Sequence, residues 1–232
     1  MTSGRRATGT FARSSVMALV SVVALVGGVA VMGLLHLVPS SAGIDPVRRT
    51  ISEYAHGPDK WLFDTAVLLV ALGSAGVFVV VAGRAPARRV PASTVFGGLW
   101  VLGLVAVVVF PKTDWSVGPS VAGTIHRYAS VVAFLCLPFA VWSAANVVFG
   151  AASRPRVVTR LLALVSWAWL GVILTAVAVM LAGGEPWWRS IPLGLVERLL
   201  AGTEVAAVLS LAPGLLRADD LTPEKGDPLV RY

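Results

Sequence analysis

The sequence predicts an all-α membrane protein, a bundle of six transmembrane helices, and three observations support this prediction. The chain has 232 residues, of which 56% are hydrophobic and only 13% are charged, while soluble domains have about 25% charged residues. Six apolar stretches approach or exceed the roughly 20 residues that a helix needs to cross a bilayer. The basic residues lie mainly in the short connections between these stretches.

The six expected spans alternate with polar connections that contain proline or glycine. The third span is the shortest, and the fourth contains Pro138, which removes a backbone hydrogen bond and favours a kink. The first span resembles a signal peptide in its flanking residues, but its apolar core exceeds the roughly 7–15 residues of such peptides, so we expect it to remain uncleaved. The spans are expected at residues 15–38, 61–82, 92–110, 123–149, 157–182 and 193–216.

The distribution of charge predicts that both termini are cytoplasmic. With the N-terminus inside, twelve lysines and arginines fall on the inner side and seven on the outer side, as the positive-inside rule requires. The two inner loops contain no acidic residue. We therefore expect a basic cytoplasmic N-terminus (1–14), one membrane domain (15–216) and a disordered cytoplasmic tail (217–232).

Composition also excludes several classes of function. The net charge of +7 is explained by membrane orientation, so nucleic acid is not an expected partner. The single cysteine, Cys136, lies in an apolar run, and no phosphate-binding, dinucleotide-binding or CxxC motif is present; we expect no cofactor and no metal. The high content of Ala, Val, Gly and Arg suggests a bacterium, and hence the plasma membrane. The oligomeric state is left open.

The first outer loop, residues 39–59, is longer than most connections in compact domains. Asp45-Pro46 is typical of the start of a helix, and Gly57-Pro58 of its end. We therefore expect a short helix from Pro46 to Ala55.

Several ionisable residues fall inside or beside the expected spans, where charged groups usually face the bundle interior and pair with one another. Glu197 and Glu204 are seven residues apart and so share one face of a helix. We predict a polar cluster near the outer end of the bundle, formed by Glu53, Tyr54, Asp64, Asp114, His126, Arg127, Glu197, Arg198 and Glu204.

Three tryptophans, Trp100, Trp167 and Trp169, lie too deep for the interfacial belt. We expect them to pack between helices, each with a partner for its indole N–H. A groove for a lipid tail or an aromatic ligand is the alternative.

The sequence also resembles a known family. Ser52-Glu53-Tyr54-Ala55-His56-Gly57 after the first span resembles the signature of the "domain of unknown function 998" family of bacterial and archaeal multi-pass membrane proteins. The likeness continues with Phe110-Pro111, Asp114 and His126. The resemblance implies six spans over about residues 15–216 and implies no activity.

Three functions stay open at this point, and whether the protein is an enzyme is undecided. The first is an outward-facing polar site that binds or transports a lipid headgroup or a small polar ligand, with Glu204 as a candidate proton or cation site. The second is a metal-dependent lipid hydrolase, in which His36, His56 and His126 would converge on zinc beside Ser52. The third is a structural or accessory membrane protein whose polar cluster only holds helices together.

Overall fold

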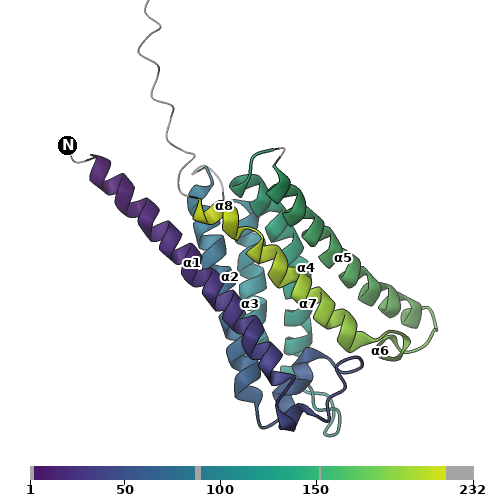
Figure 1. Ribbon diagram of the computed structural model, residues 1–232. Coiled ribbons are helices and arrows are strands. Elements are labelled where there is room, and N and C mark those ends of the chain that lie inside the picture. Colours follow the sequence, from purple (N-terminus) through teal and green to yellow (C-terminus); the bar gives the residue numbers. More distant parts are fainter. Residues whose placement is uncertain (1–2, 87–89, 152, 218–232) are drawn as a thin grey trace, which may run out of the picture.

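The computed structural model describes residues 3–86, 90–151 and 153–217, and its regular elements are helices (Figure 1). Six helical segments in this part of the chain are long and apolar enough to cross a membrane, which confirms the predicted all-α, six-span fold. The long helices are α1 (Ser3–Leu35), α2 (Lys60–Arg84), α3 (Ala92–Val109), α4 (Val121–Val148), α5 (Arg154–Leu181) and α7 (Leu193–Leu209). The short ones are η1 (Pro39–Ser41), η2 (Ile51–His56), α6 (Trp187–Ser190) and α8 (Ala212–Leu216).

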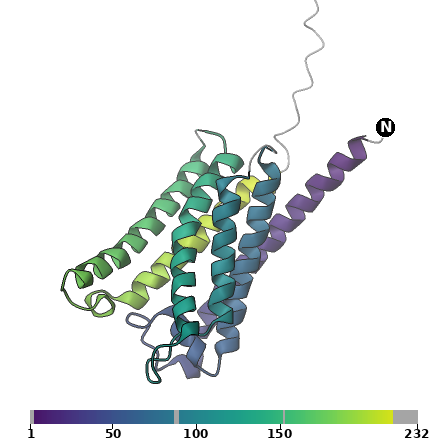
Figure 2. The same ribbon diagram turned by 180° about the vertical axis from the view of Figure 1, so that it is seen from behind.

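The long helices form a ring in which each packs against the next. Consecutive helices contact one another from α1 to α5, α5 packs on α7, and α8 returns to α1. Figures 1 and 2 show the same order from the two sides, with α5 and α7 tilted away from the α2–α3–α4 layer. Among the contacts that close the ring, the one between α1 and α7 is the weakest, because these two helices have few contacts along their length. The distance between them increases from the α8 end toward the η2 end (Figure 1).

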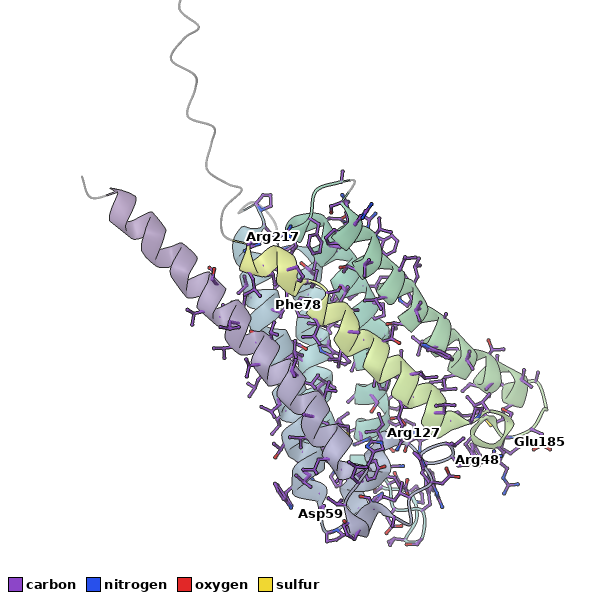
Figure 3. The ribbon with its side chains drawn as sticks, viewed as in Figure 1. Arg48, Asp59, Phe78, Arg127, Glu185 and Arg217 are labelled. Atoms are coloured by element: carbon purple, nitrogen blue, oxygen red, sulfur yellow. The ribbon has the colours of Figure 1, made fainter. Side chains whose placement is uncertain are left out.

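The connections gather at the two ends of the bundle. The loop between α1 and α2, the α3–α4 connection and the segment containing α6 lie together at one end, called here the η2 end. Figure 3 shows Asp59, Arg48, Arg127 and Glu185 there, and Arg217 beside α8 at the opposite end. The two ends of the described chain lie at this opposite end (Figure 1), as an even number of crossings requires.

The first and sixth membrane spans lie at Ser14–Leu35 and Leu193–Leu216, close to the predicted ranges. The helix that contains the first span extends beyond it, back to Ser3. The sixth span is not continuous, because α7 ends at Leu209 and α8 starts at Ala212, with Pro213 in its first turn. A proline has no N–H to donate to the preceding turn, so the helix breaks there. Arg84 stabilises the short α8 by donating to the carbonyls of Gly214 and Leu215, both at 2.6 Å. The predicted tail lies almost wholly outside the described residues.

Small residues allow close contact between α1 and α2. Gly73 of α2 faces Ser21 and Leu25 of α1, and a Cβ atom at Gly73 would lie 2.7 Å from both the Ser21 carbonyl oxygen and Leu25 Cγ. Without a hydrophobic force between helices in lipid, such close backbone contact is a main source of association energy. Leu25 and Val77 are fully buried around this contact.

Replacing Gly73 by alanine is expected to destabilise the α1–α2 pair by about 1–3 kcal/mol, because a backbone carbonyl cannot move aside as a flexible side chain can. Thermal unfolding of the purified protein in detergent measures this. Gly171→Ala is the matched control, because a Cβ there meets nothing within 4 Å. Equal melting temperatures for the two variants would contradict the packing described.

Candidate functional site

Arg198 fastens the loop between α1 and α2 to the beginning of α7. Its Nε donates to Nε2 of His36 at 2.8 Å, and its Nη1 donates to the carbonyls of Pro46 and Arg49 at 2.8 and 2.7 Å. Its Nη2 lies 3.3 Å from the hydroxyl of the buried Tyr54. One side chain thus joins α7, the end of α1 and both halves of the loop.

The loop between α1 and α2 makes two hydrogen bonds to α7 in place of one hydrogen bond within a helix of its own. In an α-helix over residues 46–55, Ile51 N–H would donate to the Val47 carbonyl. Instead Ile51 N–H donates to Oε2 of Glu197 at 3.0 Å, and the Val47 carbonyl accepts from Leu195 N–H at 3.1 Å. A short helix is present in this loop, as predicted, but the predicted bounds, Pro46 to Ala55, are wrong, because the helix covers only Ile51–His56. A turn after Asp45, whose Oδ1 accepts from Val47 N–H at 2.8 Å, precedes the shorter 3-10 helix η2.

Gly194, the second residue of α7, makes this approach possible. A Cβ atom at this position would overlap the carbonyl oxygens of Pro46 and Arg49. These are the two loop carbonyls that Arg198 binds, so a glycine here lets the arginine reach them.

Glu53 connects the loop to the segment that follows α3. Lys112 Nζ donates to Glu53 Oε2 at 2.5 Å and to Thr50 Oγ1 at 2.7 Å, and Arg49 lies 3.8 Å from the other Glu53 oxygen. Burial disfavours the charged form of Glu53, but the hydrogen bond and positive charge of Lys112 outweigh it and lower the pKa of Glu53 below its ordinary 4.5. The carboxylate is thus held as half of an ion pair.

His126 is buried near the start of α4 and faces the same region. Its Nδ1 lies 2.9 Å from the Phe110 carbonyl and 3.1 Å from the Val107 carbonyl. Because both partners are acceptors, Nδ1 carries the hydrogen, and Nε2 of the neutral ring is an acceptor. Among the described residues the ring makes hydrogen bonds through Nδ1 only, which leaves Nε2 as a free acceptor on a residue that lines the space described next.

That space is a cavity of about 380 Å³ enclosed by α1, α2, α3, α4, α7 and η2. Its wall is apolar over most of its depth. Its polar side chains are concentrated at the η2 end, where they come from α1, η2, α4 and α7: His36, Ser52, His126, Ser130, Glu197 and Arg198. The apolar wall includes Met32, Phe63, Val67, Trp100, Leu104 and Phe134. The volume is at the lower end of the range of small-molecule pockets, about 300–1,000 Å³.

The cavity is open on one side, between α1 and α7. Val29 and Gly33 on α1 and Gly202 on α7 line it and are themselves exposed. All three lie within the membrane-spanning stretches of their helices. The opening therefore faces the side of the bundle that the bilayer covers.

The structure brings together five of the nine predicted site residues. Glu53, Tyr54, Glu197 and Arg198 form the network that holds the loop, and His126 joins Glu197 and Arg198 in lining the cavity. The predicted ion pairs between these spans do not form among the described residues. Arg198 binds a histidine, carbonyls and a hydroxyl, because the loop backbone reaches it before any carboxylate does.

Three predicted site residues lie apart from the cavity. Asp64 forms an ion pair with Lys60 one turn earlier, at 2.5 Å. Asp114 is exposed, and hydrogen bonds from Ser116 lower the pKa of its carboxyl. Arg127 is exposed and lies over the ring of Trp115, 5.6 Å from its centroid.

Glu204 is fully buried, and neither carboxylate oxygen has a hydrogen-bond partner among the described residues. It does not line the cavity, although Glu197, two turns earlier on the same helix, does. The expectation that it joins the outer polar cluster is wrong, because it lies in the apolar core beyond the polar end.

The predicted polar cluster left out several residues of this region, although His36 and Ser52 belonged to the zinc hypothesis and Trp100 to the alternative of a ligand groove. His36, Ser52 and Trp100 line the cavity, and Lys112 pairs with Glu53. His36 and Lys112 are polar residues at the ends of predicted spans, and this position is the sequence signal that could have identified them. The indole nitrogen of Trp100 is buried without an acceptor among the described residues, contrary to the expected partner.

The zinc hypothesis has no ligand set in the part of the chain that the structure describes. No three His, Cys, Asp or Glu side chains there are grouped so that they could hold a metal ion. His56 is exposed on η2, and His36 is bonded through both ring nitrogens, to Arg198 and to the Met32 carbonyl at 2.7 Å. The Ser52 hydroxyl contacts Thr50 Oγ1 at 3.2 Å.

The fold and its composition define a multi-pass integral membrane protein with six spans. The chain belongs to the DUF998 family, described as proteins of unknown function, whose family profile matches residues 22–213. This confirms the resemblance carried by residues 52–57, 110–114 and 126. No curated protein and no solved structure matches the chain.

The Glu53–Lys112 pair is expected to make stability depend on pH. Because the pKa of Glu53 is lowered in the folded state, the pair's contribution is fully present above the ordinary value of 4.5 and is lost as the pH falls through the folded-state pKa. The measurement is the difference in melting temperature between the wild type and Glu53→Gln as a function of pH. This difference should shrink below pH 4.5; a difference that is constant from about pH 7 to about pH 3 would contradict the assignment.

Proposed function

We propose that the cavity binds a membrane amphiphile, with its polar head at the η2 end and its apolar chain between α1 and α7. The observation that carries this proposal is the division of the cavity into an apolar body and a polar end, combined with an opening on the membrane-facing side. A bilayer lipid or single-chain amphiphile has the same division along its own length.

The position of the opening favours a ligand that comes from the bilayer. Val29, Gly33 and Gly202 frame it from apolar helix faces, so a water-soluble ligand would have to cross hydrocarbon to enter there. An alkyl chain would instead move from one apolar environment to another. Six spans of this kind place the protein in a membrane, and we propose the bacterial plasma membrane with the η2 end outward, on the basis of the charge distribution.

Binding is preferred to a purely structural role because of the unused hydrogen-bonding capacity in the cavity. A polar group that only holds helices together uses its capacity within the protein, as Arg198 does. His126 makes hydrogen bonds through Nδ1 only among the described residues, to the carbonyls of Val107 and Phe110, which leaves Nε2 as a free acceptor. A hydrogen bond from a ligand would use this acceptor.

Closing the opening tests the proposal. A Cβ at Gly33 or at Gly202 meets nothing within 4 Å, so Gly33→Leu and Gly202→Leu add a side chain at the opening without disturbing packing. Leucine is also the better helix former by roughly 0.8–1.0 kcal/mol, so both variants should fold. Gly171→Leu on α5 is the matched control, because its position is equally open and lies away from the cavity.

The amphiphiles that copurify from native membranes are quantified by mass spectrometry of the extracted lipids and of the intact protein. The wild type and Gly171→Leu should retain the same bound species, and Gly33→Leu with Gly202→Leu should lose most of it. Equal retention by all variants, or no bound amphiphile in the wild type, would overturn the proposal.

A further inference from the structure

The proposed function does not specify the chemistry of the head group. The free hydrogen-bond donors and acceptors at the polar end indicate which head group fits. We infer that the cavity takes an amphiphile whose head is uncharged and bears hydroxyl groups, of the kind found in a monoacylglycerol or an alkyl glycoside. This inference rests on the proposed function and adds the ligand class.

The cationic group at the polar end has little capacity left for a ligand. Nε of Arg198 is bonded to His36, and its Nη1 is bonded to three carbonyls, of Pro46, Arg49 and Gly194. Nη2 has the Tyr54 hydroxyl as a partner at 3.3 Å. A phosphate or carboxylate head usually binds two parallel N–H groups of an arginine. Here Nε and Nη1 are occupied by the protein, and Nη2 keeps at most one N–H free, so no parallel pair of N–H groups is available.

Apart from one N–H of Arg198 Nη2, the groups left open at the polar end are acceptors. His126 Nε2 is an acceptor, and the hydrogen bonds of this ring among the described residues are made by Nδ1. Ile51 is the one donor to Glu197 in the described chain, and it bonds to Oε2, so Oε1 retains its lone pairs. Ser130 already donates its hydroxyl hydrogen to the His126 carbonyl at 2.9 Å and therefore offers its oxygen as an acceptor as well. A matching head must donate hydrogen bonds.

The charges around the polar end already balance. Lys112 and Arg198 are positive, and Glu53 and Glu197 are negative, all of them half-buried. Arg49 pairs with Glu53 from a side chain that is 64% exposed, so water screens its charge. A further unit charge of either sign would enter a region of low dielectric without a counter-ion. Hydroxyl groups satisfy the open acceptors without this cost.

Three probes with a lauroyl or dodecyl chain of equal length but different head groups test this inference: 1-monolaurin, sodium laurate and dodecylamine. Binding to the full-length protein in detergent is measured by titration with intact-protein mass spectrometry. Monolaurin is expected to bind roughly tenfold more tightly than either charged probe, since leaving one buried polar group without a partner lowers the affinity by about a factor of ten. Tighter binding of laurate or of dodecylamine would overturn the inference but leave the proposed function intact. No binding of any probe would overturn both.

Glu197→Gln changes the head-group preference if the inference is right. The amide oxygen of glutamine can still accept from Ile51 N–H, and its NH₂ replaces the free Oε1 by a donor, while one negative charge is lost. Monolaurin affinity should fall roughly tenfold and laurate affinity should rise. Asp64→Asn is the matched control, because Asp64 pairs with Lys60 outside the cavity, and its probe affinities should equal those of the wild type. An unchanged preference in a folded Glu197→Gln protein would contradict the assignment.

Discussion

The guanidinium of Arg198 is the interaction on which the η2 end depends. It binds His36 at the end of α1, two carbonyls of the loop and the hydroxyl of Tyr54, so three chain segments meet on one planar group. Lysine could not replace it, because an ammonium group lacks the fixed fork that reaches several acceptors at once. With the loop held in this way, Ile51 and Ser52 cover the end of the cavity.

The second constraint is the imperfect closure of the helix ring. Helix α8 returns to α1 at one end of the bundle, where Arg84 holds its last carbonyls, while α1 and α7 diverge toward the other end (Figure 1). The polar residues lie where the gap between α1 and α7 meets the loop. The incomplete closure of the ring therefore both opens the bundle and produces a cavity with a polar end and an apolar body.

The fold could be predicted from the sequence because long apolar runs have few alternatives in a bilayer. The rule that intramembrane charges face inward grouped Glu197, Arg198 and His126, which line the same cavity in the structure. The partners of these residues could not be predicted, since a sequence does not show that loop carbonyls reach Arg198 before any carboxylate does. The pair Lys60–Asp64, by contrast, was visible as an i, i+4 spacing and should have removed Asp64 from the site. Glu204 was placed by helical periodicity alone, which gives the face of a helix but not the depth at which the polar region ends.

The most direct test is an experimental structure of the protein in lipid nanodiscs formed from its native membranes. The account predicts elongated density between α1 and α7 that ends in a head within hydrogen-bonding distance of His126 Nε2. Lipid density confined to the outer surface of the bundle, with the space around His126 filled by side chains, would contradict it.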